Sequence, residues 1–354
     1  MAEDVNKTTI PTLRQISQKA GVALSTVSLA LRGHPNVSQE TAVHVRAIAE
    51  RMGWKANPMV SAWLAHVRQG KDAARHSTLA YLVNYAQGID RLFHDPNFYI
   101  PRTYMNGART RANQRGYSLE VLDYRELGEH RVGSILYNQN IQGVVLAPLD
   151  SDFCGYNLNW DAFALGTIAY SLVVPPVDRV ANHHFHTVSL CMQNLYARGY
   201  RRIGLAMSEG TNLRSGDMFL GAYLSNLYRM EKLRKLKPFF PSKEAFNIDN
   251  FSGWIQQQKP DVVMALYSDV PRWLNELGYS IPDEIGYAHL DLPSEGEVYL
   301  PFAGINQQPE QIGATTIDLV AAKIDRNERG IPASPQVSLV DSLWVDGPSL
   351  KQRV

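Results

Sequence analysis

The chain has 354 residues, too many for one ordinary hydrophobic core, which predicts two or three domains. Hydrophobic residues make up 45% and charged residues 19% of the sequence, as in globular proteins, and the longest apolar runs, such as 143–149, have the length of strands. Cys154 and Cys191 cannot build a disulfide framework and lack metal-ligand spacing, and the polar N-terminus has no secretory signal. We therefore expect a cytoplasmic protein that does not span a membrane.

The charge is unevenly distributed, although its sum is only +1. Residues 1–70 hold eight Lys and Arg against four Asp and Glu, a net charge of +4. The other residues therefore carry 27 basic and 30 acidic groups, a net charge of −3. A basic segment ahead of a slightly acidic body indicates that the N-terminal part contacts a polyanion.

Three short helices are predicted within the first sixty residues. Leu13 and Ile16 share the apolar face of the first helix, which ends at Gly21, and a second helix begins three residues later near Leu24. A third helix follows, with Ser38 as its N-cap. Two short helices joined by a Gly-containing turn form the helix-turn-helix pattern.

The second helix has two distinct faces when its residues are placed at 100° intervals. The face predicted to pack on the other two helices holds Leu24, Val27, Ala30 and Leu31. The opposite face holds Ser25, Ser28, Leu29 and Arg32. Short hydroxyl side chains allow close approach to DNA, an Arg can donate to guanine or phosphate, and a Leu can contact a thymine methyl group. These residues therefore predict a DNA-recognition helix rather than a solvated helix of a small bundle.

The stretch 12–58 resembles the DNA-binding headpiece of the LacI (lactose-repressor and purine-repressor) family of transcription factors. The matching residues are Ala20, Gly21, Val22, Thr26, Val27, Ser28, Val37, Ser38, Thr41, Ala49, Gly53, Asn57 and Pro58. The resemblance places Leu24, Ser25 and Leu29 at the positions of base readout, with Thr26 and Ser28 beside them. Two departures are Ala23, where the family has Ser, and Leu29, where a polar residue is common, so Arg32 is expected to supply the polar contact.

A short helix is predicted after the headpiece, with Asn57 as its N-cap and Pro58 in its first turn. Isolated helices shorter than about 12–15 residues are marginal in water, so this one should fold only against another surface. In the family, the corresponding hinge helix forms on operator DNA and inserts a Leu into the minor groove. Trp63 stands at that position and Leu64 follows it; either is the candidate wedge, and the alternative is that Trp63 only packs in the hinge.

From Thr78 onward, apolar strands alternate with helices. Strands are predicted at 78–85, 117–124, 141–149, 163–170, 201–208, 261–267 and 284–291, and helices near 101–115, 128–139, 187–198, 216–230 and 270–277. Repeated β–α units indicate two parallel sheets with helices on both faces. This body resembles the two-lobed, periplasmic-binding-protein-like effector domain of the same family. The expected fold is thus an all-α helix-turn-helix headpiece (1–56), a hinge helix and linker (57–76), and an α/β body with two parallel sheets (77–354).

Ligands of such sheets bind at the carboxyl ends of the strands. The expected effector-site residues at these ends are Tyr85, His183, Ser268, Asp269, Asp291 and Gln307. The resemblance implies that the Asp291 carboxylate accepts hydrogen bonds from ligand hydroxyls, and it places Met218 where the family has a sugar-clamping Arg. A Met has no guanidinium group that could donate two parallel hydrogen bonds to an anionic ligand. We therefore expect a neutral sugar or similar polyol.

The sequence contains no phosphate-binding loop, zinc-protease motif, CxxC pair or nucleophile elbow, and we expect no enzymatic activity, no cofactor and no metal. The histidines of 183–186 lack a clean i, i+4 pair, so loop histidines near the ligand site are the favoured interpretation. The resemblance implies a homodimeric repressor that binds a pseudo-palindromic DNA operator and a small-molecule effector. The alternative is a small-molecule-binding protein or sugar-metabolism enzyme on a similar body, neither of which requires the headpiece.

Overall fold

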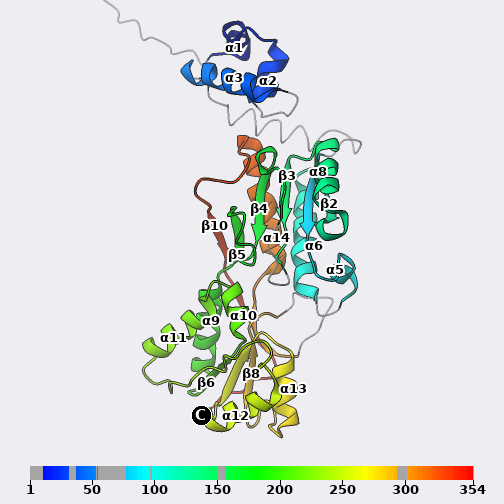
Figure 1. Cartoon of the computed structure of the whole chain (residues 1–354). Coiled ribbons are helices and arrows are strands. Elements are labelled where there is room, and N and C mark those ends of the chain that lie inside the picture. The colour runs from blue at the N-terminus through cyan, green and yellow to red at the C-terminus, as the bar shows by residue number, and fades with distance from the viewer. Residues whose placement is uncertain are drawn as a thin grey trace, which may run out of the picture.

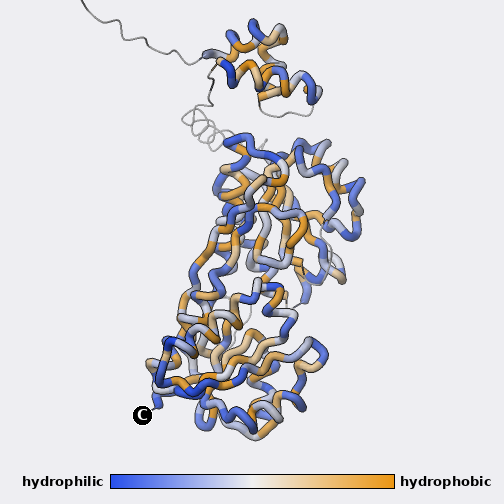
Figure 2. Tube along the Cα trace, turned by 60° about the vertical axis from the view of Figure 1, so that its left-hand side comes forward, coloured by the Kyte–Doolittle hydropathy of each residue, from blue (hydrophilic) through white to orange (hydrophobic). Residues whose placement is uncertain are grey.

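The structure of the protein, a computed structural model, describes residues 11–31, 37–52, 54, 77–95, 98–149, 156–292 and 301–353. In these ranges, three N-terminal helices precede a body of two lobes, each built around its own sheet (Figure 1). Hydrophobic segments concentrate along the strands and the inward helix faces, and hydrophilic segments lie at the periphery (Figure 2). None of the described helices has the length and apolar character needed to cross a membrane.

The N-terminal helices are α1 (Leu13–Ala20), α2 (Leu24–Leu31) and α3 (Gln39–Arg51). The α1 helix ends at Gly21, whose φ of 66° is a left-handed conformation that favours glycine. The Ser38 hydroxyl caps α3 as predicted, because it accepts a hydrogen bond from the Thr41 amide at 3.3 Å. The three helices enclose a small core of Ile16, Ala20, Val27, Ala30, Val45, Ile48 and Ala49.

Sheet A forms the core of lobe 1, and all of its strands are parallel. Its strand order is β10-β5-β4-β3-β1-β2. The strands are β1 (Ser77–Val83), β2 (Tyr117–Asp123), β3 (Gly143–Leu146), β4 (Ala164–Ile168), β5 (Arg179–Asn182) and β10 (Val337–Val340). The covering helices are α5 (Asp90–His94), α6 (Tyr99–Gln114), α7 (Tyr124–Leu127), α8 (Glu129–Asn138) and α14 (Pro309–Arg326), with a 3-10 turn, η2 (Trp160–Ala162).

Sheet B forms the core of lobe 2, in the order β11-β9-β8-β7-β6. Its strands are β6 (Ile203–Ala206), β7 (Val262–Ala265), β8 (Gly286–His289), β9 (Ala303–Asn306) and β11 (Leu343–Val345). The covering helices are α9 (His184–Ala197), α10 (Glu209–Arg214), α11 (Met218–Arg229), α12 (Ile248–Gln258) and α13 (Asp269–Glu276). The predicted strands and helices are found within a few residues of their expected bounds.

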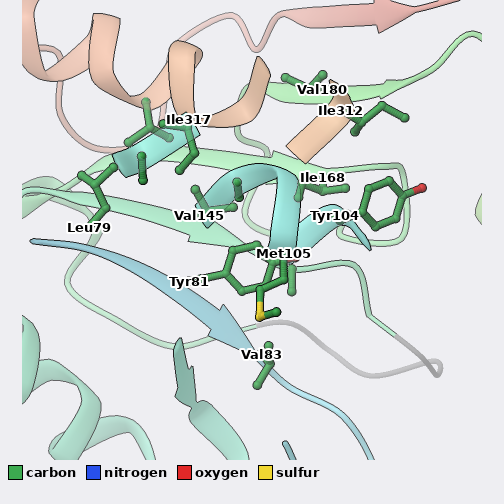
Figure 3. Packing of buried hydrophobic residues seen from close by; sticks show 14 of the residues in the cluster. Leu79, Tyr81, Val83, Tyr104, Met105, Val145, Ile168, Val180, Ile312 and Ile317 are labelled. Carbon is green, nitrogen blue, oxygen red and sulfur yellow. The ribbon is translucent and has the colours of Figure 1, made fainter. Parts of the chain in front are cut away.

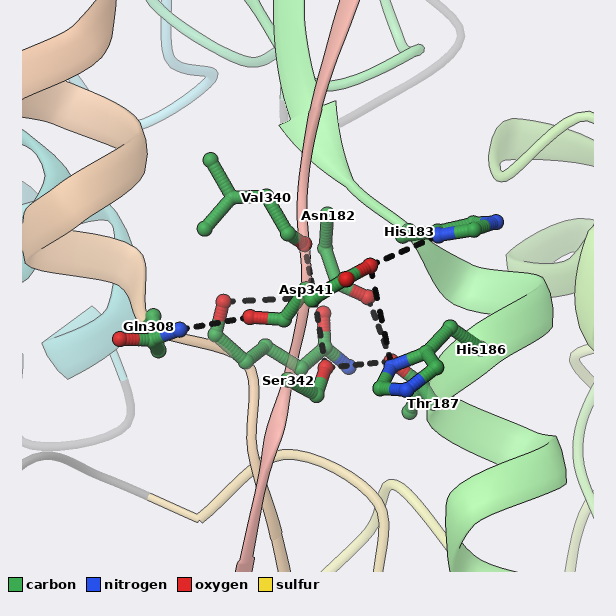
Figure 4. Close-up of polar contacts among 9 residues, drawn as sticks. Asn182, His183, His186, Thr187, Gln308, Val340, Asp341 and Ser342 are labelled. Atoms are coloured by element: carbon green, nitrogen blue, oxygen red, sulfur yellow. Dashed lines mark hydrogen bonds and ion pairs between the residues drawn. The ribbon is translucent and has the colours of Figure 1, made fainter.

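The expectation of two parallel sheets is corrected in one respect, because β11 pairs antiparallel to β9. Only Asp341 and Ser342 separate β10 from β11, so the two strands form a nearly continuous extended segment (Figure 4). The β10 strand runs toward the boundary between the lobes, parallel to β5. Its continuation must therefore run away from that boundary, opposite to β9.

The α6 and α14 helices pack closely against each other on one face of sheet A. A Cβ atom added at Gly107 would lie 2.1 Å from the carbonyl oxygen of Glu310, and one at Gly313 would lie 1.9 Å from that of Tyr104. Only glycine permits this approach. The two helices cover a core that includes Tyr81 and Met105 (Figure 3).

The α9 helix begins at His184, three residues earlier than predicted. His184 and His186 therefore belong to its first turn, and His183 precedes it, so the expectation of loop histidines is corrected. The backbone carbonyl of His183 accepts a hydrogen bond from the Thr187 amide at 3.0 Å, which starts the helix there. Among the described residues, no three His, Cys, Asp or Glu side chains are arranged to hold a metal ion.

Candidate functional site

The α2 helix presents several of the residues predicted to contact DNA. Ser25 is exposed, Leu24 is 49% exposed and Leu29 is half-buried. On the other face, Val27 and Ala30 are fully buried, as predicted. Leu24 does not pack in the core as its helical phase predicted, because it begins the helix, where α1 and α3 leave it uncovered.

The remaining predicted DNA contacts are only partly within the described structure. Thr26 is half-buried on α2. The side chain of Ser28, and the whole of Arg32, Asn57, Trp63 and Leu64, lie outside the described residues. The hinge helix and its wedge therefore stay predictions.

Asp291 lies directly beyond the carboxyl end of β8 and beside the other lobe. Its carbonyl oxygen accepts a hydrogen bond from the Tyr99 hydroxyl in the first turn of α6, at 3.3 Å. Its Oδ1 atom is enclosed and has no hydrogen-bond partner among the described residues. Burial raises the pKa of this carboxyl group from 3.8 to about 8. A buried acceptor without a partner is the feature that a ligand hydroxyl would satisfy.

His289 lies two residues before Asp291 and is only 1% exposed. Its Nδ1 atom accepts a hydrogen bond from the Asp291 amide at 3.0 Å, so the ring hydrogen resides on Nε2. Burial lowers the pKa of this imidazole to about 4, and Nε2 has no partner in the described part of the chain. The end of β8 thus offers one unpaired donor and one unpaired acceptor.

Gln307, from the end of β9, is brought to the same place. Its Nε2 atom donates a hydrogen bond to the carbonyl oxygen of Leu290 at 2.8 Å, and its side chain is buried. Tyr85, from the end of β1, is also fully buried, and its ring packs edge-on against Phe98 with 4.8 Å between centroids. Tyr85 is therefore part of the lobe 1 core as well as a strand-end residue.

His183 is placed at the boundary where the chain crosses between the lobes. The crossings lie between β5 and α9, between β9 and α14, and between β10 and β11. The Nδ1 atom of His183 is 2.8 Å from Oδ1 of Asp341, and that of His186 is 3.8 Å from the same oxygen (Figure 4). His183, at the first crossing, thus contacts Asp341, at the third crossing.

A buried network continues from this contact and ties all three crossings together. The Asn182 amide nitrogen donates to the Ser342 hydroxyl at 2.8 Å and to the Gln307 carbonyl oxygen at 3.3 Å (Figure 4). The Thr187 hydroxyl donates to the side-chain oxygen of Asn182 at 2.7 Å. From the second crossing, Gln308 donates to the Asp341 carbonyl oxygen at 2.6 Å.

The other predicted effector residues lie on helix starts of lobe 2. Met218 is half-buried at the start of α11. Ser268 and Asp269 are exposed at the start of α13, where Asp269 forms an ion pair with Arg272 at 2.6 Å. The Asp269 carboxylate is therefore engaged within its own helix, unlike that of Asp291.

Sequence reasoning missed the aromatic residues contributed by helices. Tyr99 contacts Asp291, and burial together with the Asp291 charge raises the pKa of Tyr104. In lobe 2, the half-buried His184 ring lies 4.5 Å from that of Phe219, between centroids. The strand-end rule selects residues that follow strands, whereas the first turn of a helix such as α6 reaches the same edge of the sheet.

Comparisons with known proteins match both parts of the chain. The family described as bacterial regulatory proteins, lacI family, matches residues 12–57, and the periplasmic binding protein-like domain matches residues 192–348. The chain is 27% identical to the HTH-type transcriptional regulator PtxS of Pseudomonas plecoglossicida over 239 residues, 63% of this chain. It is 40% identical to the HTH-type transcriptional regulator GntR of Pseudomonas aeruginosa over 73 residues, 21% of this chain. The matches span 61% and 21% of these relatives' lengths.

Solved structures share the whole architecture. The transcriptional regulator CelR–cellobiose complex superposes with a TM-score of 0.55 at 19% identity, over 96% of this chain and 99% of that one. The lac repressor dimer bound to operator and the anti-inducer ONPF superposes with a TM-score of 0.53 at 16% identity, over 97% and 100%. These likenesses establish the fold.

The fold and the site define a protein with a helix-turn-helix domain joined to a two-lobed periplasmic-binding-protein-like body. Residues 12–57 match the lacI family of bacterial regulatory proteins and residues 192–348 match a periplasmic binding protein-like domain, so the resemblance predicted from the sequence is confirmed for both parts of the chain.

Proposed function

We propose that the chain is a sequence-specific DNA-binding transcriptional regulator, a repressor, controlled by a small molecule bound between its lobes. The observation that carries this proposal is the union of a lacI-family domain at 12–57 with a two-lobed body in one chain. The proposed parts are a headpiece (1–56), a hinge helix with linker (57–76), and an effector-binding and dimerisation domain (77–354). Such a regulator works in the cytoplasm.

Reading of the operator is assigned to the exposed side of α2, with Leu24, Ser25 and Leu29 near its centre. Two headpieces of a homodimer would contact the half-sites of a pseudo-palindrome. Arg32, Thr26 and Ser28 complete this surface, and Asn57 begins the hinge helix whose Trp63 or Leu64 enters the minor groove. The lac repressor structure, which is a dimer bound to operator, supports this arrangement through its fold.

The effector is proposed to bind at the strand ends around Asp291, with Tyr85, His183, Met218, Ser268, Asp269 and Gln307 as the other contacts. The unpaired Oδ1 of Asp291 and Nε2 of His289 suit adjacent hydroxyl groups, which can donate and accept hydrogen bonds. Met218, at the position of the family Arg, has no charged group that could donate two hydrogen bonds to an anion. This favours a neutral sugar. The complexes of CelR with cellobiose and of the lac repressor with ONPF support a ligand of this class.

Selection of duplexes from a random library tests the DNA-binding part. We expect the full chain to enrich a two-fold symmetric sequence, and its genomic positions would identify the regulated genes. Enrichment of no sequence, under conditions in which a known regulator enriches its own site, would overturn this part.

Calorimetry against neutral and phosphorylated sugars tests the effector part. We expect a neutral sugar to bind, Asp291→Ala to weaken it at least tenfold, and the DNA affinity of the ligand-free variant to stay intact. Asp283→Ala is the matched control, because its exposed carboxylate pairs with Lys351 at 3.2 Å before the start of β8, away from the strand ends. Tight binding of a phosphorylated sugar that is indifferent to Asp291 would overturn the assignment.

A further inference from the structure

A basic stretch in lobe 2 is not used by the proposed DNA-reading or effector-binding sites. Residues 229–237 contain five Lys and Arg and one Glu, a net charge of +4 in nine residues. The first 70 residues have the same net charge of +4, but it is spread over eight basic and four acidic groups. Since residues 71–354 together carry −3, this stretch is a local reversal of charge.

The fold joins this stretch to the amino end of sheet B. The Arg234 amide donates to the carbonyl oxygen of Arg201, just before β6, at 2.8 Å. The Lys237 amide donates to the side chain of Gln258, at the end of α12, at 2.9 Å. Lys259 follows Gln258 directly. We call the exposed side chains gathered here the basic surface: Arg229, Lys232, Arg234, Lys235, Lys237 and Lys259.

The charges of the basic surface are not neutralised by the protein. In the described ranges, none of its six side chains forms an ion pair. Glu231 is the sole acid within 229–237, and the neighbouring Asp261 uses its Oδ2 atom to accept from the Arg201 amide at 2.8 Å. The Lys235 ammonium lies 5.6 Å from the ring centroid of Tyr228, which is 80% exposed. Six such cations favour a polyanionic partner.

Within 229–237 no apolar side chain is exposed, and the exposed Tyr228 ring beside the stretch lies next to Lys235. Leu233 and Leu236 are 5% and 7% exposed and pack inward. Protein partners generally need a desolvated apolar or aromatic centre in the interface, whereas phosphate backbones are bound by Lys and Arg alone. The basic surface therefore suits nucleic acid better than an acidic protein.

The location of the basic surface separates it from the headpiece attachment. Parallel strands of both sheets end at the boundary between the lobes, so their amino ends lie at opposite ends of the body (Figure 1). The headpiece joins at Ser77, the first residue of β1, at the far end of lobe 1. The basic surface lies beside the first residues of β6, at the far end of lobe 2.

We propose that the basic surface binds the phosphate backbone of a second duplex DNA segment, without reading its sequence. This inference rests on the proposed function in one respect only: the headpiece is the part that binds the first duplex. Phosphate contacts of this kind release counterions, so the logarithm of the affinity falls with the logarithm of salt by about 0.9 per phosphate neutralised.

The test compares the full chain with the triple variant Lys232→Gln, Arg234→Gln, Lys235→Gln. Affinity for a 30-base-pair duplex of random sequence is measured across a series of salt concentrations. We expect the salt slope of the triple variant to be shallower by about 1–3, with far-ultraviolet circular dichroism unchanged. Arg131→Gln, which removes an exposed cation on α8 of lobe 1, is the control and should not change the slope. Equal slopes in all three proteins would overturn the proposal.

A bridging assay gives a second readout. The protein is held on beads by a biotinylated duplex recovered from the library selection, and capture of a fluorescent random duplex is measured. The parent should capture it and the triple variant should not. Displacement of the fluorescent duplex by poly-glutamate at equal charge concentration would contradict a nucleic-acid partner and indicate an acidic protein. If the selection recovers no duplex, the proposed function fails while the salt-slope comparison still stands.

Discussion

Burial shifts the pKa values of two neighbouring side chains at the end of β8 in opposite directions. Burial holds a proton on Asp291 to about pH 8 and keeps one off His289 down to about pH 4. At pH 7 the native protein therefore contains a protonated carboxyl group and a neutral imidazole at the candidate ligand site. Both groups can exchange hydrogen bonds with hydroxyls without adding a net charge to the buried site.

The Asp291 carboxyl group should make stability fall as pH rises between about 4 and 8. Its native pKa of about 8 exceeds the unfolded value of 3.8, so the native state holds the proton through an interval in which the unfolded chain has lost it. Stability is therefore lost as pH rises toward 8. Between pH 6.5 and 8 we expect the free energy of unfolding to fall by about 2 kcal/mol, and Asp291→Asn to remove that fall. Urea denaturation at several pH values measures it.

The His289 imidazole gives the opposite trend and a control. Its native pKa is depressed, so stability is lost as pH falls from about 6.5 toward 4. Between about pH 4 and 6.5 Asp291 acts in the opposite direction, because its native state keeps a proton that the unfolded chain has lost, so Asp291→Asn should expose the full acid limb. A variant that loses the acid limb and keeps the alkaline one would contradict the assignment of the two groups.

The recognition face of α2 gives a prediction about single base contacts. Ser25→Ala and Arg32→Ala should each weaken binding to the selected duplex by about 1–3 kcal/mol, because each removes a polar contact. Ser25 is exposed, so its variant should unfold at the parent temperature. The measurement is a DNA titration at fixed salt, with Gln18→Ala, exposed on α1, as the control. Unchanged affinity in both variants would show that α2 is oriented otherwise.

At the scale of elements, one buried ion pair connects α14 to the β4–β5 region. The Lys323 ammonium lies 2.6 Å from Oδ2 of Asp178, and these side chains are only 4% and 14% exposed. The other carboxylate oxygen of Asp178 accepts from the Gln336 amide at 2.8 Å, just before β10. Asp178 thus helps position both the long helix and the edge strand of sheet A.

Removing one partner of this pair should be strongly destabilising. Asp178→Ala leaves the Lys323 charge buried and unpaired, and we expect a loss of about 3–5 kcal/mol in the free energy of unfolding. Adding Lys323→Met removes the orphaned charge and should recover a large part of the loss. Chemical denaturation of the three proteins measures this double-mutant cycle. Equal stability of the single and double variants would contradict an ion-pair role.

The hinge segment gives a prediction about an element that forms on binding. The backbone amides of 58–66, apart from Pro58, which has no N–H, should exchange freely in the unbound protein and become protected on the selected duplex, because a helix this short needs a surface to fold against. Comparison of the parent with Trp63→Phe separates the fluorescence change of Trp63 from that of the other tryptophans. Equal protection with and without DNA would refute folding on binding.

At the scale of the whole molecule, the lobes are linked through three crossings and the network around Asn182. Its amide group contacts the second crossing at Gln307 and the third at Ser342, while its oxygen accepts from Thr187. Any rotation of one lobe against the other must alter these bonds. The bonds of this network therefore help to hold the two lobes in their relative orientation.

Asn182→Ala should loosen this linkage. Loss of the amide leaves the buried Thr187 and Ser342 hydroxyls with fewer partners, and we expect about 1–3 kcal/mol of destabilisation. Asn157→Ala is the control, because that exposed side-chain amide donates to Glu129 within lobe 1 and should change stability by less than about 0.5 kcal/mol. Calorimetric unfolding measures both. Equal effects of the two variants would contradict a linking role for Asn182.

The sequence by itself determined the headpiece helices, seven strands and several helices of the body, and the resemblance to the LacI family, but it did not predict bounds for β5, β9 or α14. Helical periodicity and caps such as Ser38 are local signals, and apolar strands alternating with helices define an α/β body wherever they occur. The motif at 12–58 identified the DNA-binding part for the same reason, since its turn and faces lie within a few dozen residues. The strand-end rule also selected Asp291 and Gln307, which the fold brings together.

Only the tertiary structure decided how distant segments meet. The antiparallel direction of β11 follows from its passage between the lobes, which no local pattern encodes. Tyr99 contacts Asp291 across 192 positions in the chain, and Lys323 pairs with Asp178 across 145. The pKa values of Asp291 and His289 depend on burial, which arises when the lobes and their helices pack together. Such desolvation is a property of the assembled surroundings, and the residue types alone do not carry it.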